Sequence, residues 1–372
     1  MAETTGVVLK QSDVVLKCAS CGGQRVFDPD TQKLRCEQCG TETELSESPT
    51  KQIVEYDFRS AEENLDPAWS AATHSFQCPS CGATTVLEAQ ATATRCAFCG
   101  EPQVVDTAAV PGIRPEAVVP FRVDRAKANE AFRAWLSKRF FAPAAVKREY
   151  LQDKISGVYL PYWTYDAGTE SDYTGQAGDY YYVTESYNEI VNGKSMLRTR
   201  QVRKIRWRYI AGHYSEAFDD LLVPATKSIE TKWLDKLEPF PLEALQPYRP
   251  DYLSGFSAER YGVDLKEGFA IAQQKMDVRI RQGITRQVAA DEIRLATLDT
   301  HYTDITYKHL LLPLWISSYR YGLKTYRFLV NGHTAEVTGT YPVSVPKVLL
   351  TILAVLAALA VAYYFISQAT GS

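Results

Sequence analysis

Residues 180–191 read YYYVTESYNEIV, residues 194–210 read KSMLRTRQVRKIRWRYI, and the dipeptide Asn192-Gly193 stands between them. Both runs are rich in aromatic and β-branched residues, which favour strands. Asn-Gly between two strand-like runs is the strongest short-range signal of a β-hairpin. The stretch therefore predicts a hairpin within a strand region that covers residues 157–210.

The second strand of this hairpin is strongly basic, with seven Lys and Arg and no acid between residues 194 and 208. Side chains of a strand alternate between its two faces. All of the cations except Arg203 then share one face: Lys194, Arg198, Arg200, Lys204, Arg206 and Arg208. Such a face could meet anionic lipid headgroups, an acidic part of the chain or nucleic acid. The alternative is a solvated face whose cations pair with Glu185 and Glu189 across the hairpin.

Around the hairpin, the sequence predicts a mixed domain of antiparallel sheet and helices over residues 121–345. Asp124 can cap a helix, and the longest helix is expected at residues 263–282. One face of that helix repeats apolar residues: Leu265, Phe269, Ala272, Met276 and Ile280. Strands return at residues 293–340, with a second Asn-Gly hairpin expected at Asn331-Gly332.

The pattern Leu-Pro-x-Trp occurs at residues 160–163 and again at residues 312–315, each time before a Tyr-rich strand. The repeat could mark two related halves of the domain, each a small sheet. The alternative is coincidence, because the chain is rich in aromatic residues and holds 23 Tyr.

Two four-cysteine motifs precede this domain and use all eight Cys of the chain. Residues 18–40 read CASCGGQRVFDPDTQKLRCEQCG and residues 78–100 read CPSCGATTVLEAQATATRCAFCG, so C-x2-C-x14-C-x2-C recurs after 60 residues. Closed sites of four thiolates around zinc are structural. We predict two zinc ribbons, each with one Zn²⁺, and iron is the alternative metal. The expected ligands are Cys18, Cys21, Cys36, Cys39, Cys78, Cys81, Cys96 and Cys99.

The expected order of segments is a lead-in at 1–17, a ribbon at 18–45, a linker with a short helix at 46–73, a second ribbon at 74–105, a Pro-rich linker at 106–120, the mixed domain at 121–345, a transmembrane helix at 348–366 and a tail at 367–372. Residues 1–110 hold eight Lys and Arg against sixteen Asp and Glu, a net charge of −8. Nucleic-acid binding uses cations that neutralise phosphates, so the acidic ribbons favour docking of a protein.

Residues 348–366 read VLLTILAVLAALAVAYYFI, 19 residues without a charge. As a helix they would span about 28 Å, close to the roughly 30 Å hydrocarbon core of a bilayer. A buried core helix is the alternative. Lys347 precedes the run, so we expect a single-pass, tail-anchored protein of the inner or plasma membrane with its N-terminal domains in the cytoplasm. Ala354, Ala358 and Ala362 repeat at a spacing that could support helix packing and a homo-oligomer.

Catalytic motifs are missing from the sequence. Gly193-Lys194-Ser195 resembles the end of a phosphate loop, but that pattern requires Gly where the chain has Asn188. The chain has no H-E-x-x-H, G-x-S-x-G or G-x-G-x-x-G, and its five His are scattered. We therefore expect a non-enzyme. An enzyme of unrecognised type in the Tyr-rich domain is the alternative.

Several stretches together resemble a family of bacterial zinc-ribbon membrane proteins: FDPDTQKLRCEQCG at 27–40, GVYLPYWTYDA at 157–167, LLPLWISSYRYGLKTYRFLVNG at 311–332 and the C-terminal anchor. The resemblance covers most of the chain. Members are often labelled primosomal protein N-prime (PriA)-like or described as having a TFIIB-type zinc ribbon. Helicase activity does not carry over, because the chain lacks a phosphate loop and helicase motifs. Some relatives are associated with SPFH-domain, flotillin-like proteins and with phage-shock-protein-A-type membrane-stress proteins, and the resemblance implies recruitment of such partners.

Taken together, these patterns predict an α+β protein in which two small zinc ribbons precede a mixed antiparallel-sheet and helix domain and one transmembrane helix. The expected function is that of a membrane-anchored adaptor that recruits a cytosolic protein to the lipid bilayer. The alternative is a membrane-tethered nucleic-acid-binding protein without helicase activity, whose binding would use the basic strand.

Overall fold

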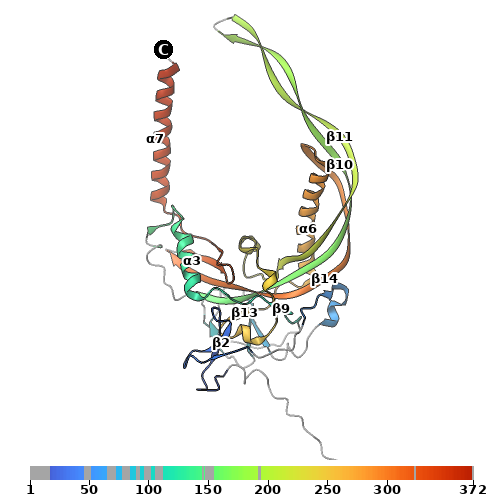
Figure 1. Ribbon diagram of the computed structural model, residues 1–372. Coiled ribbons are helices and arrows are strands. Elements are labelled where there is room, and N and C mark those ends of the chain that lie inside the picture. Colours follow the sequence, from blue (N-terminus) through green and yellow to red (C-terminus); the bar gives the residue numbers. More distant parts are fainter. Residues whose placement is uncertain are drawn as a thin grey trace, which may run out of the picture.

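The computed structural model describes residues 17–45, 52–64, 73–77, 84–88, 93–95, 102–104, 112–144, 146, 155–191, 194–321 and 324–370. The chain forms an α+β body from which two long elements project on the same side (Figure 1). One is a twisted β-hairpin and the other is the C-terminal helix. The first four-cysteine ribbon lies at the opposite side of the body.

Three long strands form the centre of the body: β10 (Ser156–Val191), β11 (Lys194–Pro224) and β14 (Glu292–Tyr321). β10 lies in the middle and pairs antiparallel with both neighbours. Val191 pairs with Lys194 at the end of the β10–β11 ladder, which confirms the hairpin predicted there. β11 is longer than the sequence indicated, because it continues past residue 210 to its end at Pro224.

Short strands extend this sheet: β4 (Tyr56–Asp57), β5 (Thr73–Gln77), β6 (Thr84–Glu88), β9 (Ala117–Val118), β12 (Gln246–Pro247), β13 (Ser257–Glu259), β15 (Lys324–Asn331) and β16 (Val337–Gly339). Two small sheets stand apart from it: β1 (Arg25–Asp28) with β2 (Lys33–Cys36) and β3 (Glu42–Thr43), and β7 (Ala93–Arg95) with β8 (Pro102–Val104). Ala117 and Val118 of β9 are fully buried beside β14. The linker expected at 106–120 therefore ends in a strand of the body. Burial of its apolar side chains is more favourable than their exposure to water.

The prediction of a two-residue Asn-Gly turn at Asn331-Gly332 is wrong. β15 and β16 do pair, but Val330 pairs with Val337, so a longer loop separates the strands. Within this loop the Asn331 side chain accepts hydrogen bonds from the backbone N–H groups of His333 at 2.9 Å and Thr334 at 3.1 Å. Asn therefore acts through its side chain here, as in an Asx turn, and not as the left-handed corner of a two-residue hairpin.

The two Leu-Pro-x-Trp segments lie side by side at the centre of the sheet. They run antiparallel, and Leu160 is paired with Leu312. A short parallel strand flanks each segment in the same way: β13 lies beside β10, and β9 lies beside β14.

The tryptophans of the two segments make equivalent hydrogen bonds. Trp163 Nε1 donates to the carbonyl oxygen of Val263 at 3.0 Å, and Trp315 Nε1 donates to that of Val123 at 2.8 Å. The centre of the body therefore has approximate two-fold symmetry, which is the arrangement that two related halves would give. Duplication itself stays a prediction.

Each of these valines leads into a helix through an Asp: α3 (Arg125–Ser137) follows Asp124, and α6 (Leu265–Val288) follows Asp264. Both Asp side chains accept a hydrogen bond from the backbone N–H three residues on, which is the N-cap geometry that starts a helix. α6 lies along the concave side of the long hairpin (Figure 1). Its predicted apolar face is buried at all positions except the partly buried Phe269.

Short helical turns connect the larger elements: η1 (Phe58–Asn64), α5 (Thr231–Leu234), η3 (Asp235–Leu237), η4 (Leu242–Ala244) and η5 (Pro250–Leu253). η5 packs against the first ribbon. The ring of Phe27 lies edge-on to the ring of Tyr252, with the two ring centroids 5.2 Å apart. The loops between these turns therefore contribute to the surface on which the ribbon sits.

Beyond Gly178, β10 has no further pairing with β14, and the hairpin continues with two strands only. We name this part the arm and define it as residues 179–191 and 194–206. Apolar side chains near its tip are exposed to solvent: Ile190 is 78% exposed and Leu197 is 73% exposed.

α7 (Val345–Thr370) projects from the same side of the body as the arm (Figure 1). Lys347 Nζ fixes its first turn to the body by donating to the carbonyl oxygens of Phe140 at 3.0 Å and Ala142 at 2.8 Å. The segment Val345–Tyr363 has a mean hydropathy of 2.4, and none of it is buried. It is the one helix in the described part of the chain that is long and apolar enough to cross a membrane.

Candidate metal centre

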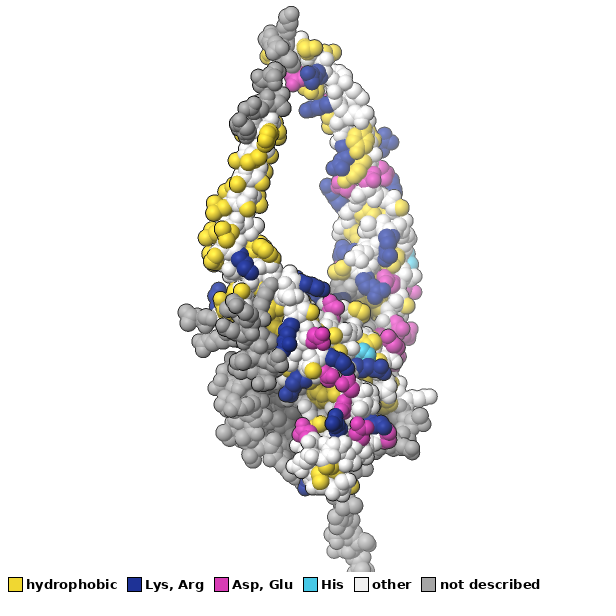
Figure 2. Space-filling view, turned by 60° about the vertical axis from the view of Figure 1, so that its left-hand side comes forward, with side chains coloured by type: hydrophobic (Ala, Val, Ile, Leu, Met, Phe, Trp, Pro, Cys, Tyr) yellow, Lys and Arg dark blue, Asp and Glu magenta, His cyan; other side chains and the backbone are white. Residues whose placement is uncertain are grey.

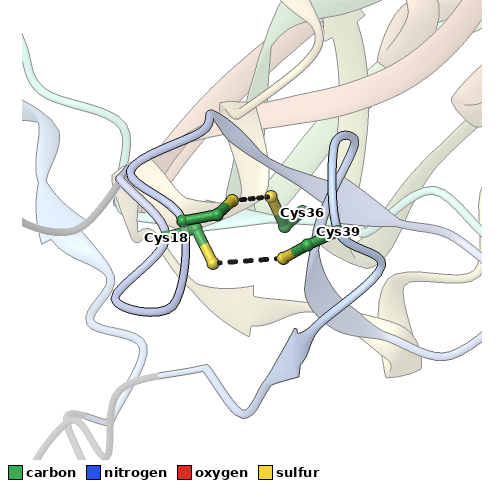
Figure 3. Close-up of side chains that lie close together, drawn as sticks. Cys18, Cys36 and Cys39 are labelled. Atoms are coloured by element: carbon green, nitrogen blue, oxygen red, sulfur yellow. Dashed lines mark hydrogen bonds between the residues drawn. The ribbon is translucent and has the colours of Figure 1, made fainter.

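Four cysteines form a compact group at the outer end of the first ribbon (Figure 3). The Sγ atoms of Cys18, Cys21, Cys36 and Cys39 all lie within 4.8 Å of one another. Cys18 Sγ is 3.6 Å from Cys39 Sγ, and Cys21 Sγ is 3.5 Å from Cys36 Sγ. Four thiolates at about 2.3 Å from a tetrahedral zinc ion would be about 3.8 Å apart. The group can therefore hold one metal ion of this size.

Two tight turns bring the cysteines together. The N–H of Gly22 donates to the carbonyl oxygen of Cys18 at 2.8 Å, and the N–H of Gly40 donates to that of Cys36 at 2.9 Å. The two glycines have φ angles of +72° and +73°, which side chains with a Cβ rarely adopt. The Gly after each cysteine pair therefore closes the turn that aims both thiols at the same point.

Hydrogen-bond donors and neighbouring thiols shift the pKa values of two of these cysteines. The Thr41 hydroxyl, 3.1 Å from Cys39 Sγ, and the Thr41 backbone N–H lower the pKa of Cys39 to about 6. At Cys21 the backbone N–H of Gly23 also favours the thiolate, but the thiols of Cys39 and Cys36 outweigh it and raise the pKa of Cys21 to about 12. A cation between the sulfurs, such as a zinc ion, would favour the thiolate form of the ligands together.

The first ribbon, predicted over residues 18–45, packs against the body. Phe27 and Leu34 are 2% and 1% exposed and belong to a core cluster of the body. The N–H of Phe27 donates to the carbonyl oxygen of Ser254 at 3.0 Å, and Ser254 Oγ donates to that of Arg25 at 2.6 Å. The apolar side of the ribbon is too small to form a core alone, so it completes its burial against the body.

The second cysteine set lies outside the residues that the structure describes: Cys78, Cys81, Cys96 and Cys99. The second zinc ribbon therefore stays a prediction. Strand β6, which precedes the second cysteine pair of this set, pairs antiparallel with β13 through Val86 and Ala258. This pairing attaches β6 to the same sheet.

Four of the six cations on the predicted basic face have acidic partners. Four cations of β11 form ion pairs across the hairpin: Arg198 with Glu189 at 2.7 Å, Arg200 and Lys204 with Glu185 at 3.5 and 3.1 Å, and Arg208 with Asp179 at 3.5 Å. Arg206 lies over the ring of Tyr181 at 5.3 Å, and the side chain of Lys194 falls outside the described part. The paired arrangement that the sequence left open is thus the one present. Exposed pairs of this kind each contribute about 0–1 kcal/mol to stability.

The three alanines with helix-packing spacing, Ala354, Ala358 and Ala362, lie along α7 and are exposed. Their role in association stays a prediction.

Two neighbouring buried side chains of β14 carry polar contacts that the sequence did not reveal. Lys308 Nζ lies 2.8 Å from Glu55 Oε1 and 2.6 Å from Asp220 Oδ1. His309 Nδ1 lies 2.9 Å from the carbonyl oxygen of Ile113, and burial lowers the pKa of His309 to about 4. Glu55 is 253 residues away from Lys308 in the chain, so no local spacing could have signalled the pair. These contacts attach the segments around Glu55 and Ile113 to β14.

A hollow of about 490 Å³ lies where the first ribbon meets the body. It is lined by Gln32, Leu45, Pro120, Arg122, Glu243, Ala244, Gln246, Tyr252 and His333. His333 Nδ1 lies 3.3 Å from the carbonyl oxygen of Pro120. This lining assigns no reaction, and the expectation of a non-enzyme stays untested.

No family model matches this chain, and no solved structure matches it. The chain is 27% identical over 342 residues to "Uncharacterized protein YdjG" of Bacillus subtilis (strain 168), a match that covers 89% of this chain and 91% of that protein. The similarity extends over nearly the full length of both chains.

Proposed function

We propose that the chain is a membrane-anchored scaffold that recruits a cytosolic protein to the inner or plasma membrane. The observation that carries the proposal is α7, whose 19-residue apolar segment has no cover in the body. Apolar surface in water costs about 25 cal/mol per Å², and a bilayer removes that cost. The segment is also long enough to span the hydrocarbon core.

The position of the metal centre supports a cytosolic docking role. It lies on the side of the body opposite α7 (Figure 1), so a bilayer around α7 would leave the ribbon facing away from the membrane. Lys347 at the start of α7 favours the cytoplasmic side for the body under the positive-inside rule. Cys21 and Cys39 are exposed at this outer face.

Zinc has a structural role in this proposal. It would hold the ribbon closed, and the ribbon together with the body would form the docking surface. By resemblance, the partner belongs to the SPFH or phage-shock-protein-A type. Nucleic-acid binding is the weaker alternative, because acids of β10 already pair with four of the cations that would contact phosphates.

The test is affinity purification from detergent-solubilised membranes with three chains: the native one, Cys36→Ser and the matched control Thr41→Val. Thr41→Val removes the hydroxyl beside Cys39 but leaves four thiols. We expect a specific cytosolic partner with the native and Thr41→Val chains, and its loss from Cys36→Ser while that chain still reaches the membrane. The same partners on all three chains would exclude the ribbon from docking, and no specific partner on any of them would contradict the scaffold.

A further inference from the structure

The arm has two open strand edges. β11 pairs with β10 alone, and β10 beyond Gly178 pairs with β11 alone, among the strands that the structure describes. The N–H of Tyr180 donates to Asp291 Oδ2 at 2.6 Å, so the open edge of β10 covers residues 181–191 and is about 36 Å long. An open edge is a row of unpaired N–H and C=O groups that can pair with another chain.

The direction of these backbone groups follows from the register. Val191 and Lys194 flank a two-residue turn and so form a hydrogen-bonded pair. The alternation of an antiparallel ladder then points the N–H and C=O groups of even-numbered arm residues of β10 outward. On β11 the odd-numbered residues point outward in the same way.

The two edges carry opposite charge. Residues 179–191 hold Asp179, Glu185 and Glu189 and no cation, whereas residues 194–206 hold six Lys and Arg and no acid. Two β11 edges from different copies would repel each other, and so would two β10 edges. A β11 edge beside a β10 edge of another copy is the favourable combination, because its cations would then lie between acids of both arms.

The anchor sets the relative direction of such copies. Figure 2 shows the apolar column of α7 next to the arm, whose surface mixes cationic, anionic and apolar side chains. Because α7 and the arm project from the same side of the body, copies held in one bilayer through α7 would have parallel arms. β11 of one copy then runs antiparallel to β10 of the next, so the two edges can form an antiparallel ladder.

The outward groups also match in such a pair. With the tips of two arms level, Thr199 of one copy lies opposite Ser186 of the next, as it does within each arm. Thr199 is odd-numbered on β11 and Ser186 is even-numbered on β10, so both present outward backbone groups. The ladder can therefore form without a shift in register.

We propose that the arm joins copies of this chain side by side, with the basic β11 edge of one arm pairing with the acidic β10 edge of the next. The contact is head to tail, so repetition would produce a row or a closed ring on the membrane. This inference rests on the proposed anchoring through α7, which makes the arms parallel.

The test places a benzoylphenylalanine photo-crosslinker at Ser186 of the full chain, in vesicles of phosphatidylethanolamine and phosphatidylglycerol. Copies with ¹⁴N and ¹⁵N are mixed before reconstitution, so that an adduct between copies carries both labels. We expect mixed-label adducts that map to β11 around Thr199. Adducts to β10 of the second copy, adducts to lipid alone or adducts within one copy alone would each overturn the proposal.

A backbone variant gives an independent reading, with the crosslinker moved to Thr199. Ser186→Pro removes an outward N–H without breaking the ladder inside the arm, and Ser186→Ala is its matched control. Mixed-label adducts should fall to background in Ser186→Pro and persist in Ser186→Ala; equal yields in both would contradict edge pairing. Flotation with the vesicles separates the two proposals, because a chain that floats without mixed-label adducts keeps its anchor and loses only the arm contact.

Discussion

Cys36 is the residue at which the metal centre and the core of the body meet. It is 1% exposed, and Leu34, two residues earlier on β2, is equally buried in the core cluster. A change at this ligand should therefore affect both metal content and the packing of the ribbon. Cysteine spacing alone indicated the ligand, but only the fold shows its link to the core.

We expect Cys36→Ser to lower the zinc content by one ion per chain, because a tetrahedral site with three thiolates binds zinc far less tightly. The melting temperature should fall as well, and Thr41→Val should change neither value strongly. In all variants, zinc should be released as the pH falls, because protons compete for the thiolates. Metal analysis by mass spectrometry and thermal unfolding check this. Full zinc content in Cys36→Ser would show that this group is not the metal site.

The two central tryptophans should be equally important. Trp163→Phe and Trp315→Phe each leave a buried carbonyl oxygen without its donor, at a cost of about 1–3 kcal/mol. The approximate symmetry of the centre predicts losses of similar size in thermal unfolding. Trp135→Phe, at a partly exposed position beside Tyr341, is the control. A large loss in only one of the two central variants would contradict their equivalence.

His309 should make the chain sensitive to acid. Burial lowers the pKa of His309 from 6.5 to about 4, so between these values the unfolded chain binds more protons than the folded one. Stability should then rise with pH across this window, and its loss on going from pH 6.5 to pH 4 should be on the order of 3 kcal/mol. Urea unfolding of the native chain and His309→Gln at several pH values measures this.

The variant should show a flatter dependence on pH than the native chain. Trp135→Phe, which removes no titratable group, is the control and should keep the native slope. Identical slopes in the native chain and His309→Gln would rule out His309 as the source.

At the scale of elements, the sequence predicted what depends on near neighbours. Asn192-Gly193 between two strand-like runs indicated the hairpin, Asp124 indicated the start of α3, and the cysteine spacing indicated a group of four thiols. The sequence could not predict how far the hairpin would extend past β14. The arm begins where β14 starts, at Glu292, which pairs with Gly178 of β10.

Contacts between distant segments were also hidden from the sequence. Phe27 of the ribbon binds to the loop at Ser254, and Ala117 joins the sheet beside β14. Hydrophobic spacing marks such residues as buried but does not say against what they pack. For this reason the sequence did not show that the ribbon packs against the body or that the Pro-rich segment ends in a strand of the sheet.

The arm should be removable without loss of the body. Residues 182–203 can be replaced by Asn-Gly, because Tyr181 and Lys204 form a hydrogen-bonded pair that a two-residue turn can join. The core contacts of β10 and β11 lie nearer the body than this cut, so the melting temperature and zinc content should stay close to native values. A molten or insoluble product would show that the arm is needed for folding.

The elements with proposed roles lie at two opposite sides of the body. α7 and the arm project from one side of the body, and the metal centre lies at the other (Figure 1). A bilayer around α7 would therefore hold the ribbon surface in the cytosol and align the arms of neighbouring copies. Recruitment of a partner to the membrane and pairing of the arms both depend on the position of α7 in the bilayer.

Alkaline carbonate extraction of membranes tests this placement most directly. It would compare the full chain with a version that lacks residues 345–370, and protease treatment of sealed, cytoplasm-facing vesicles would then test orientation. We expect the full chain to stay in the membrane pellet, the shortened chain to be released, and the body to be digested from the cytoplasmic side. Release of the full chain by carbonate, or protection of its body from protease, would contradict the account.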